Sequence, residues 1–72
     1  MQTVPILNNT KRILKEQDKT PYRLAQEWNK HSNYVYSLVN QDQWPDGTSL
    51  KTLVDLSKLL NVPVEALFTV VE

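Results

Sequence analysis

The chain has 72 residues and a formal net charge of zero, because eight basic residues balance eight acidic ones. It lacks cysteine and has a single histidine and a single glycine, which excludes disulfides, thiolate or multi-histidine metal sites, and glycine-rich phosphate loops. No apolar run is long enough to span a membrane and no secretory signal opens the chain, so we expect one cytoplasmic domain over residues 1–72 with no cofactor, metal or small-molecule ligand.

The charges are unevenly distributed along the chain. Residues 1–30 contain six basic and three acidic residues, whereas residues 31–72 contain two and five. A basic surplus is usual in proteins that bind nucleic acid, so the neutral total argues against that role and the basic first part argues for it. A solvated, lysine-rich helix face gives the same pattern, and the charges alone leave both interpretations open.

Two short helices are predicted in the first part of the chain. The first covers about residues 7–17, with its apolar residues on one side and with Asn8 or Asn9 as its cap. The second covers residues 21–28, with Thr20 as its cap and a proline at the first helical position. It ends at Asn29, because asparagine tolerates a left-handed backbone.

A third helix and a loop follow. Ser32 or His31 is expected to cap this helix, which runs through about Val39. Residues 40–49 contain a proline and an Asp-Gly pair and show no apolar periodicity. These features are typical of a loop.

A fourth helix is predicted over residues 50–60. Ser49 is its N-cap, and Asn61 ends it in the left-handed region. The buried side of this helix is expected to consist of apolar residues at helical spacing: Leu50, Leu53, Val54, Leu56 and Leu60.

The last part of the chain combines a short helix and a strand. Pro63 begins a fifth helix that runs through Leu67 or Phe68. The aromatic and β-branched residues 68–71 favour a strand. We expect residues 3–6 to pair with this strand, with fewer hydrogen bonds than usual because a proline lies among them.

The helices predicted over residues 21–28 and 32–39 are separated only by the turn at residues 29–31. Ala25 supplies the small side chain that two steeply crossing helices need, and apolar residues of both helices interlock beneath the turn. This is the arrangement of a helix-turn-helix over residues 20–40. In that motif the second helix lies in the major groove of DNA.

At these residues the chain resembles the Xre/Cro-type helix-turn-helix family, which includes the phage repressors. The stretch TPYRLAQEW at residues 20–28 is similar to the first half of the family's motif. Val35, Leu38 and Asn40 match the apolar, apolar and asparagine positions of the second half. With further matches in the last two helices, the resemblance covers residues 7–68.

The resemblance implies an all-α, lambda-repressor-like fold of five short helices that binds operator DNA as a dimer and regulates transcription. The chain departs from the family at several positions. Asn29 and Lys30 stand where the family has a glycine and an apolar residue, and Pro21 replaces a glutamine that contacts phosphate in family members. The loop after the motif is longer than usual and carries Asp42 and Asp46.

Polar side chains cluster on one side of the third predicted helix. Asparagine pairs bidentately with adenine, serine contacts either kind of base, and tyrosine reaches a phosphate or a thymine methyl group. This helix carries no lysine or arginine, so it does not read guanine through arginine. The predicted base-reading residues are Ser32, Asn33, Tyr36, Ser37 and Asn40. An ordinary solvent-exposed polar face is the alternative interpretation.

The predicted phosphate contacts surround the second helix and its turn, because basic side chains and the N-terminal end of a helix attract phosphate. They are Lys19, Thr20, Arg23, Lys30, Tyr34 and Gln41. For Tyr34, a half-buried packing role fits the sequence equally well. Lys11, Arg12 and Lys15 are expected only to broaden the positive field.

Both tryptophans are expected to pack in or over the core, and the C-terminal apolar residues are expected to pack against a second copy of the chain. Trp28 is expected in the core, and Trp44 as a lid over the core, with an anchor for a partner as the alternative. The C-terminal apolar residues exceed what a small core needs, and an exposed apolar patch usually marks an interface. We therefore expect a two-fold homodimer through Val64, Leu67, Phe68 and Val70.

The sequence therefore predicts a sequence-specific regulator of transcription, a repressor that binds an inverted-repeat operator in double-stranded DNA as a homodimer. The alternative is a protein-interaction module of the same fold, of the antitoxin or anti-repressor type, with weak or no DNA binding. Its neutral charge and acidic loop motivate this alternative. An enzyme is not expected, because no carboxylate pair and no nucleophile–histidine pair has suitable spacing.

Overall fold

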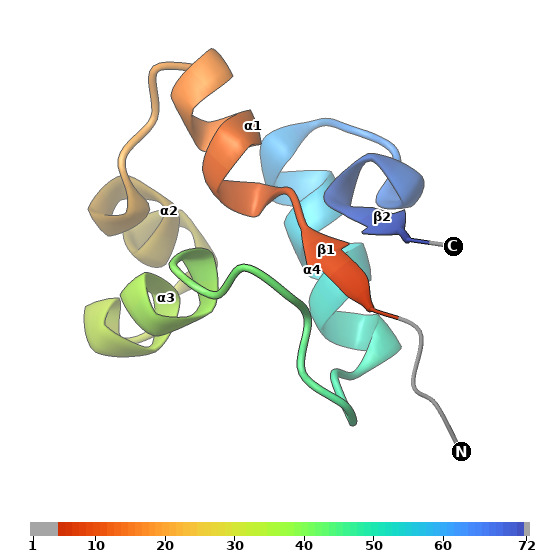
Figure 1. Ribbon diagram of the computed structural model, residues 1–72. Helices are drawn as coiled ribbons and strands as arrows, with labels where there is room; N and C mark the ends of the chain where they lie inside the picture. Colours follow the sequence, from red (N-terminus) through yellow and green to blue (C-terminus); the bar gives the residue numbers. More distant parts are fainter. Residues whose placement is uncertain (1–4, 72) are drawn as a thin grey trace.

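The computed structural model describes residues 5–71, and this part of the chain forms four α-helices, one 3₁₀ helix and a two-stranded sheet (Figure 1). In chain order these elements are β1 (Ile6–Asn8), α1 (Thr10–Glu16), α2 (Pro21–Trp28), α3 (Ser32–Val39), α4 (Leu50–Leu60), η1 (Val64–Leu67) and β2 (Phe68–Val70). The helix pair predicted on either side of residues 29–31 is present as α2 and α3. No helix of the described part is both long and apolar enough to cross a membrane.

The α2–α3 pair and the sheet lie at opposite ends of the molecule. In Figure 1, α2 and α3 occupy the left of the view and β1 and β2 the right, while α1 lies between them and α4 runs behind β1. The strands β1 and β2 are antiparallel, with Leu7 opposite Thr69. This arrangement leaves one side of α3 turned away from the rest of the protein.

The helix ends follow the local chemistry of the sequence. The Thr20 hydroxyl accepts a hydrogen bond from the Arg23 N–H at 3.2 Å, and the Ser49 hydroxyl accepts one from the Thr52 N–H at 3.2 Å. Asn29 ends α2 with φ of 57°, and Asn61 ends α4 with φ of 55°. The predicted caps of α2 and α4 are confirmed, because capping depends on neighbouring residues only.

A single core holds the helices together. Ala25 is buried in α2, the helix that packs against α3. Trp28 is only half-buried and packs against the rim of the core. The largest fully buried side chains come from all four α-helices and from η1: Thr10, Leu24, Val35, Leu56, Leu60 and Leu67.

The N-terminal and C-terminal elements differ from the sequence-based predictions. The first helix begins at Thr10, because Ile6–Asn8 pairs with β2 and is therefore extended. The Asn8 carboxamide oxygen then accepts from the Thr10 N–H at 2.9 Å and opens the helix. Instead of a fifth α-helix, the chain forms the short 3₁₀ helix η1, because the strand that starts at Phe68 ends the helical run.

The predicted strand pair exists, but its first strand is Ile6–Asn8 rather than residues 3–6. Ile6 lies opposite Val70, and residues 3 and 4 of the predicted strand lie outside the described residues. Leu50, predicted in the buried stripe of α4, is 71% exposed. It is the first residue of α4 and extends beyond the edge of the core. Helical spacing correctly placed Leu50 on the same side of the helix as the buried residues, but it does not show whether another part of the protein covers that position.

Trp44 is buried and connects the long loop to the core. Its indole N–H donates a hydrogen bond to the Leu67 carbonyl at 3.0 Å. On the same stretch, the Trp44 N–H donates to the Ile6 carbonyl and the Asn8 N–H donates to the Asp42 carbonyl, both at 2.9 Å. These hydrogen bonds hold the loop along the outer edge of β1. Trp44 therefore covers the core as a lid, as the sequence analysis predicts.

Replacing Trp44 by phenylalanine is expected to lower the free energy of unfolding by about 1–3 kcal/mol, because the Leu67 carbonyl loses its buried donor. Urea unfolding followed by circular dichroism measures the change. Trp28→Phe is the control and should cost less, since Trp28 is half-buried. Equal losses for the two variants would contradict the role given to Trp44.

Candidate functional site

One side of α3 is polar, uncharged and open to solvent. We call the exposed residues Asn33, Tyr36, Ser37 and Asn40 the α3 face. Tyr36 is 43% exposed, whereas Val35, Leu38 and Val39 on the other side of the helix are buried. Ser32, also predicted to read bases, is half-buried at the start of the helix. The α3 face therefore projects outward, as the sequence predicts.

Hydrogen bonds hold both ends of α3. At its start, Nδ1 of His31 accepts from the Asn33 N–H at 3.2 Å, so His31 rather than Ser32 is the cap. At its end, the Asn8 carboxamide nitrogen donates to the Leu38 carbonyl at 2.9 Å. Because Asn8 belongs to β1, the sheet fixes the far end of α3. A helix of eight residues needs such contacts to stay in place, since isolated short helices are marginal.

The long loop lies beside the α3 face and does not cover it. Tyr34, Ser37 and Gln41 line one side of a hollow of about 350 Å³, and residues 44–49 line the other. Asp46 lies on the loop side of this hollow. Asn33, Tyr36 and Asn40 stay exposed, so most of the face is free to meet a partner.

An aromatic pair and a lysine sit at the start of α3. The rings of Trp28 and Tyr34 have centroids 5.9 Å apart at 58°, and Nζ of Lys30 lies 5.7 Å from the Trp28 centroid and 6.0 Å from that of Tyr34. A cation over aromatic rings is held by their negative faces. Tyr34 is 46% exposed, so it both packs on Trp28 and borders the surface. Lys30 is thereby held close to the turn before α3.

Two of the predicted phosphate contacts are tied to a carboxylate. Nζ of Lys19 lies 2.9 Å from Oε1 of Glu27, and Nε of Arg23 lies 3.6 Å from Oε2 of the same residue. Only 18% of the Lys19 side chain is exposed, compared with 70% for Arg23. Arg23 can therefore turn toward a ligand, whereas Lys19 is largely committed to Glu27.

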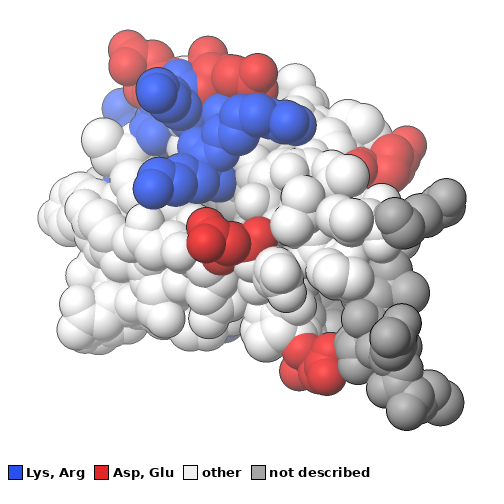
Figure 2. Space-filling view, in the orientation of Figure 1, with Lys and Arg blue, Asp and Glu red and all other residues white. Residues whose placement is uncertain are grey.

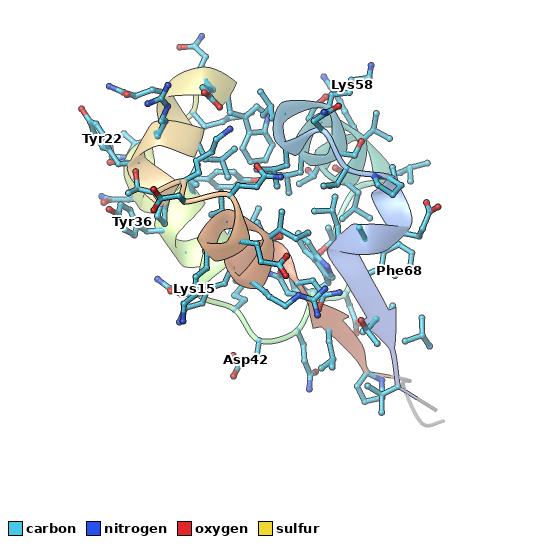
Figure 3. All side chains as sticks on the ribbon, turned by 90° about the horizontal axis from the view of Figure 1, so that it is seen from above. Lys15, Tyr22, Tyr36, Asp42, Lys58 and Phe68 are labelled. Carbon is cyan, nitrogen blue, oxygen red and sulfur yellow. The ribbon has the colours of Figure 1, made fainter. Side chains whose placement is uncertain are left out.

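Tyr22 is a surface residue that the sequence analysis did not single out. It is 55% exposed at the start of α2. Figure 3 places Tyr22 and Tyr36 together on the side away from Lys58 and Phe68. The exposure of Tyr22 could have been predicted from its position directly after Pro21, because this places it in the first turn of α2.

Between residues 5 and 71, no group of three or more histidine, aspartate or glutamate side chains is arranged to hold a metal ion. The C-terminal surface predicted for dimerisation loses one member, because Leu67 is fully buried in the core. Phe68 and Val64 are half-buried. Val70 is 51% exposed and Val71 is 40% exposed, so the apolar surface at this end is carried by β2 and the residue after it.

The observed architecture defines a class of small helical domains that combine an exposed, polar third helix with a strand pair at the opposite end. The sequence matches no protein-family model and no curated protein. The fold is similar to the crystal structure of "a putative DNA-binding protein from Bacteroides fragilis", with a TM-score of 0.75. The two chains are 31% identical, and the match covers 89% of this chain and 98% of the other. This chain belongs to the same family as the Bacteroides fragilis protein.

The ion pair between Lys19 and Glu27 makes the stability of the protein depend on pH. The hydrogen bond from Lys19, followed by the positive charges of Lys19 and Arg23, holds the pKa of Glu27 below its ordinary value. The pair therefore contributes to stability above the ordinary carboxyl pKa, and the contribution is lost as the pH falls through the lowered value. Carboxyl NMR titration should show Glu27 ionised at lower pH than an unpaired glutamate.

In the Lys19→Met variant the pKa of Glu27 should rise toward its ordinary value. Lys15→Met removes the same charge from the neighbouring helix and should leave the pKa of Glu27 nearly unchanged. If both variants shift this pKa equally, the hydrogen bond at 2.9 Å is not its main cause.

Proposed function

We propose that this protein is a sequence-specific regulator of transcription in the cytoplasm that binds double-stranded DNA through an Xre/Cro-type helix-turn-helix formed by α2 and α3. The observation that carries the proposal is the α3 face, a polar and uncharged surface on a helix fixed at both ends. The name of the related Bacteroides fragilis protein supports the same role. As a repressor, the protein would act by occupying its operator.

In this proposal α3 enters the major groove and its exposed side chains contact base edges. Asn33 and Asn40 pair with adenine, and Tyr36 packs on a thymine methyl group or reaches a phosphate. Since α3 carries no arginine or lysine, guanine is not read through its most common partner. The proposal therefore predicts an operator half-site rich in A·T pairs.

Phosphate contacts position the helix in the groove. Thr20 begins α2, whose N-terminal N–H groups and dipole attract a phosphate. Lys30 is held beside the start of α3 by two aromatic rings. Arg23, being exposed, exchanges Glu27 for a phosphate at small cost, since exposed ion pairs contribute little. Gln41 and Tyr34 border the groove on the loop side.

Selection of bound sequences from random duplex DNA tests the proposal. We expect an enriched, A·T-rich half-site. The Asn33→Ala/Tyr36→Ala variant should lose the preference for the enriched duplex over a scrambled one, at about 1–3 kcal/mol for each lost bidentate contact. The control variant Lys58→Ala/Glu65→Ala changes two exposed residues of α4 and η1 without altering the net charge, and should keep the preference.

Enrichment of no sequence by a folded protein would contradict a sequence-specific role. Salt dependence separates the proposal from a protein-interaction module. Binding to DNA weakens steeply as salt rises because counterions are released, whereas an apolar protein contact does not. A partner protein bound with the same affinity at low and high salt, together with no duplex binding, would favour the interaction module.

We further propose that two copies associate through β2. Hydrogen bonds from the Asn9 N–H to the Leu67 carbonyl and from the Val71 N–H to the Pro5 carbonyl connect the odd-numbered residues of this segment to β1. The N–H and C=O groups of Phe68 and Val70 therefore point away from β1, because they alternate along a strand. An open strand edge is a template for pairing with a second strand, and antiparallel pairing about a two-fold axis is self-complementary.

Pairing of two β2 strands would join two helix-turn-helix units at the ends opposite to α3 (Figure 1). Dimers of such units bind half-sites about 34 Å apart, one helical turn of DNA. An inverted-repeat operator is the expected target, since its symmetry matches that of the dimer.

Sedimentation equilibrium should give about twice the 8.4 kDa mass of the chain. The Val70→Lys variant places a charge on the free strand edge and should sediment as a monomer with an intact fold, since Val70 is exposed. Leu50→Lys introduces the same charge at the most exposed large apolar residue of α4 and should remain dimeric. Monomeric wild-type protein at tens of micromolar would contradict dimerisation.

A further inference from the structure

We propose that α1 supplies a second phosphate-binding surface, formed by Lys11, Arg12 and Lys15, beside the C-terminal end of α3. The inference rests on the proposed DNA-binding function and concerns which cations hold the duplex. It departs from the sequence-based expectation that these three residues only broaden the positive field. We call them the α1 cations.

The α1 cations are exposed and free of bound carboxylates. All three lie at the surface, and in the part of the chain that the structure describes every ion pair involves Glu27 of α2. Figure 2 shows lysine and arginine gathered over α1, while the surface over α3 is uncharged. In contrast to Lys19 and Arg23, the α1 cations therefore form no ion pair that a ligand would have to break.

The α1 cations border the end of α3. Together with Val39, Gln41 and Asp42 they line a hollow of about 490 Å³ between α1 and the residues that end α3 and begin the loop. Figure 3 places Lys15 toward the same side of the molecule as Tyr36. Gln41 follows Asn40 of the α3 face directly, so a strand of DNA that leaves this end of the face meets the hollow.

Basic groups at both ends of α3 fit the geometry of the major groove. The groove is about 12 Å wide and is bounded by two phosphate backbones, so a helix lying in it has a backbone on either side. Lys30 is held at the start of α3, and the α1 cations lie at its end. Because the protein has no net charge, its attraction for DNA depends on such local concentrations of charge.

Asp42 lies in the same hollow and opposes the effect of the cations. Its carboxylate would be repelled by a phosphate placed there. Removing this carboxylate should therefore have the opposite effect to removing a cation: Asp42→Asn should strengthen DNA binding if a phosphate backbone passes over the hollow. The same substitution should have little effect if DNA lies elsewhere.

Two double variants with equal change of net charge test the location. Lys11→Gln/Lys15→Gln alters α1, and Lys51→Gln/Lys58→Gln alters α4; both pairs are exposed. Fluorescence anisotropy with a short mixed-sequence duplex is measured over a range of KCl concentrations. The slope of log affinity against log salt should become less steep by about 2 for the α1 variant, one for each lost phosphate contact. The α4 variant should keep a slope close to that of the wild type.

Equal slopes for the two double variants would overturn the inference, because net charge alone would then account for the loss. The proposed function would still stand if Asn33→Ala/Tyr36→Ala removes sequence preference. If the wild-type protein binds no duplex, both proposals fall. Should the α1 double variant fail to fold by circular dichroism, Lys15→Gln against Lys58→Gln decides the question with an expected difference in slope of about 1.

Discussion

The burial of one side of α3 determines what the other side can offer. Val35, Leu38 and Val39 are in the core, and each buried aliphatic side chain of this kind contributes about 1.5–3 kcal/mol relative to exposure. Rotating α3 to hide its polar side would forfeit this contribution and bury amide and hydroxyl groups without partners. The burial of these apolar residues, which helps to fold the protein, therefore also keeps the α3 face exposed to solvent. No further contact is needed to expose the candidate site.

The remaining elements act as supports for α3. Asn8 in β1 binds the end of the helix, His31 caps its start, and Trp44 fastens the loop beside it through the Leu67 carbonyl. These contacts connect residues far apart in the sequence. A chain of 72 residues has a small core and correspondingly low stability, so contacts that close the loop and the sheet onto the helices contribute both to the fold and to the position of the site.

Features that depend on neighbouring residues could be predicted from the sequence, and features that depend on distant ones could not. The Thr20 cap and the left-handed Asn29 were predictable because capping is local. The extended Ile6–Asn8 segment was not, because only its pairing with β2 distinguishes it from the start of an apolar helix. The exposure of Leu50 was missed since periodicity gives a direction but does not reveal whether anything lies there.

The same distinction between local and distant determinants applies to the residues of the candidate site. The exposed residues of the α3 face follow from helical periodicity, and they are where the sequence placed them. The binding of Lys19 to Glu27 joins residues eight positions apart, on either side of the start of α2, and helical periodicity does not predict such a contact.

Lys19 and Arg23 are both paired with Glu27, whereas the α1 cations and Lys30 form no ion pair within the described residues. The α1 cations line a hollow with Gln41 at the end of α3, and the α3 face itself is the basis of the proposed function.

The most direct test of the account is an NMR titration of the ¹⁵N-labelled protein with the duplex recovered by selection. The account predicts that the largest chemical-shift changes, including those of the side-chain amides of Asn33 and Asn40, fall on α3, with smaller changes at α1 and at Lys30. Changes confined to β2 and the loop at residues 41–49, with α3 unaffected, would contradict it.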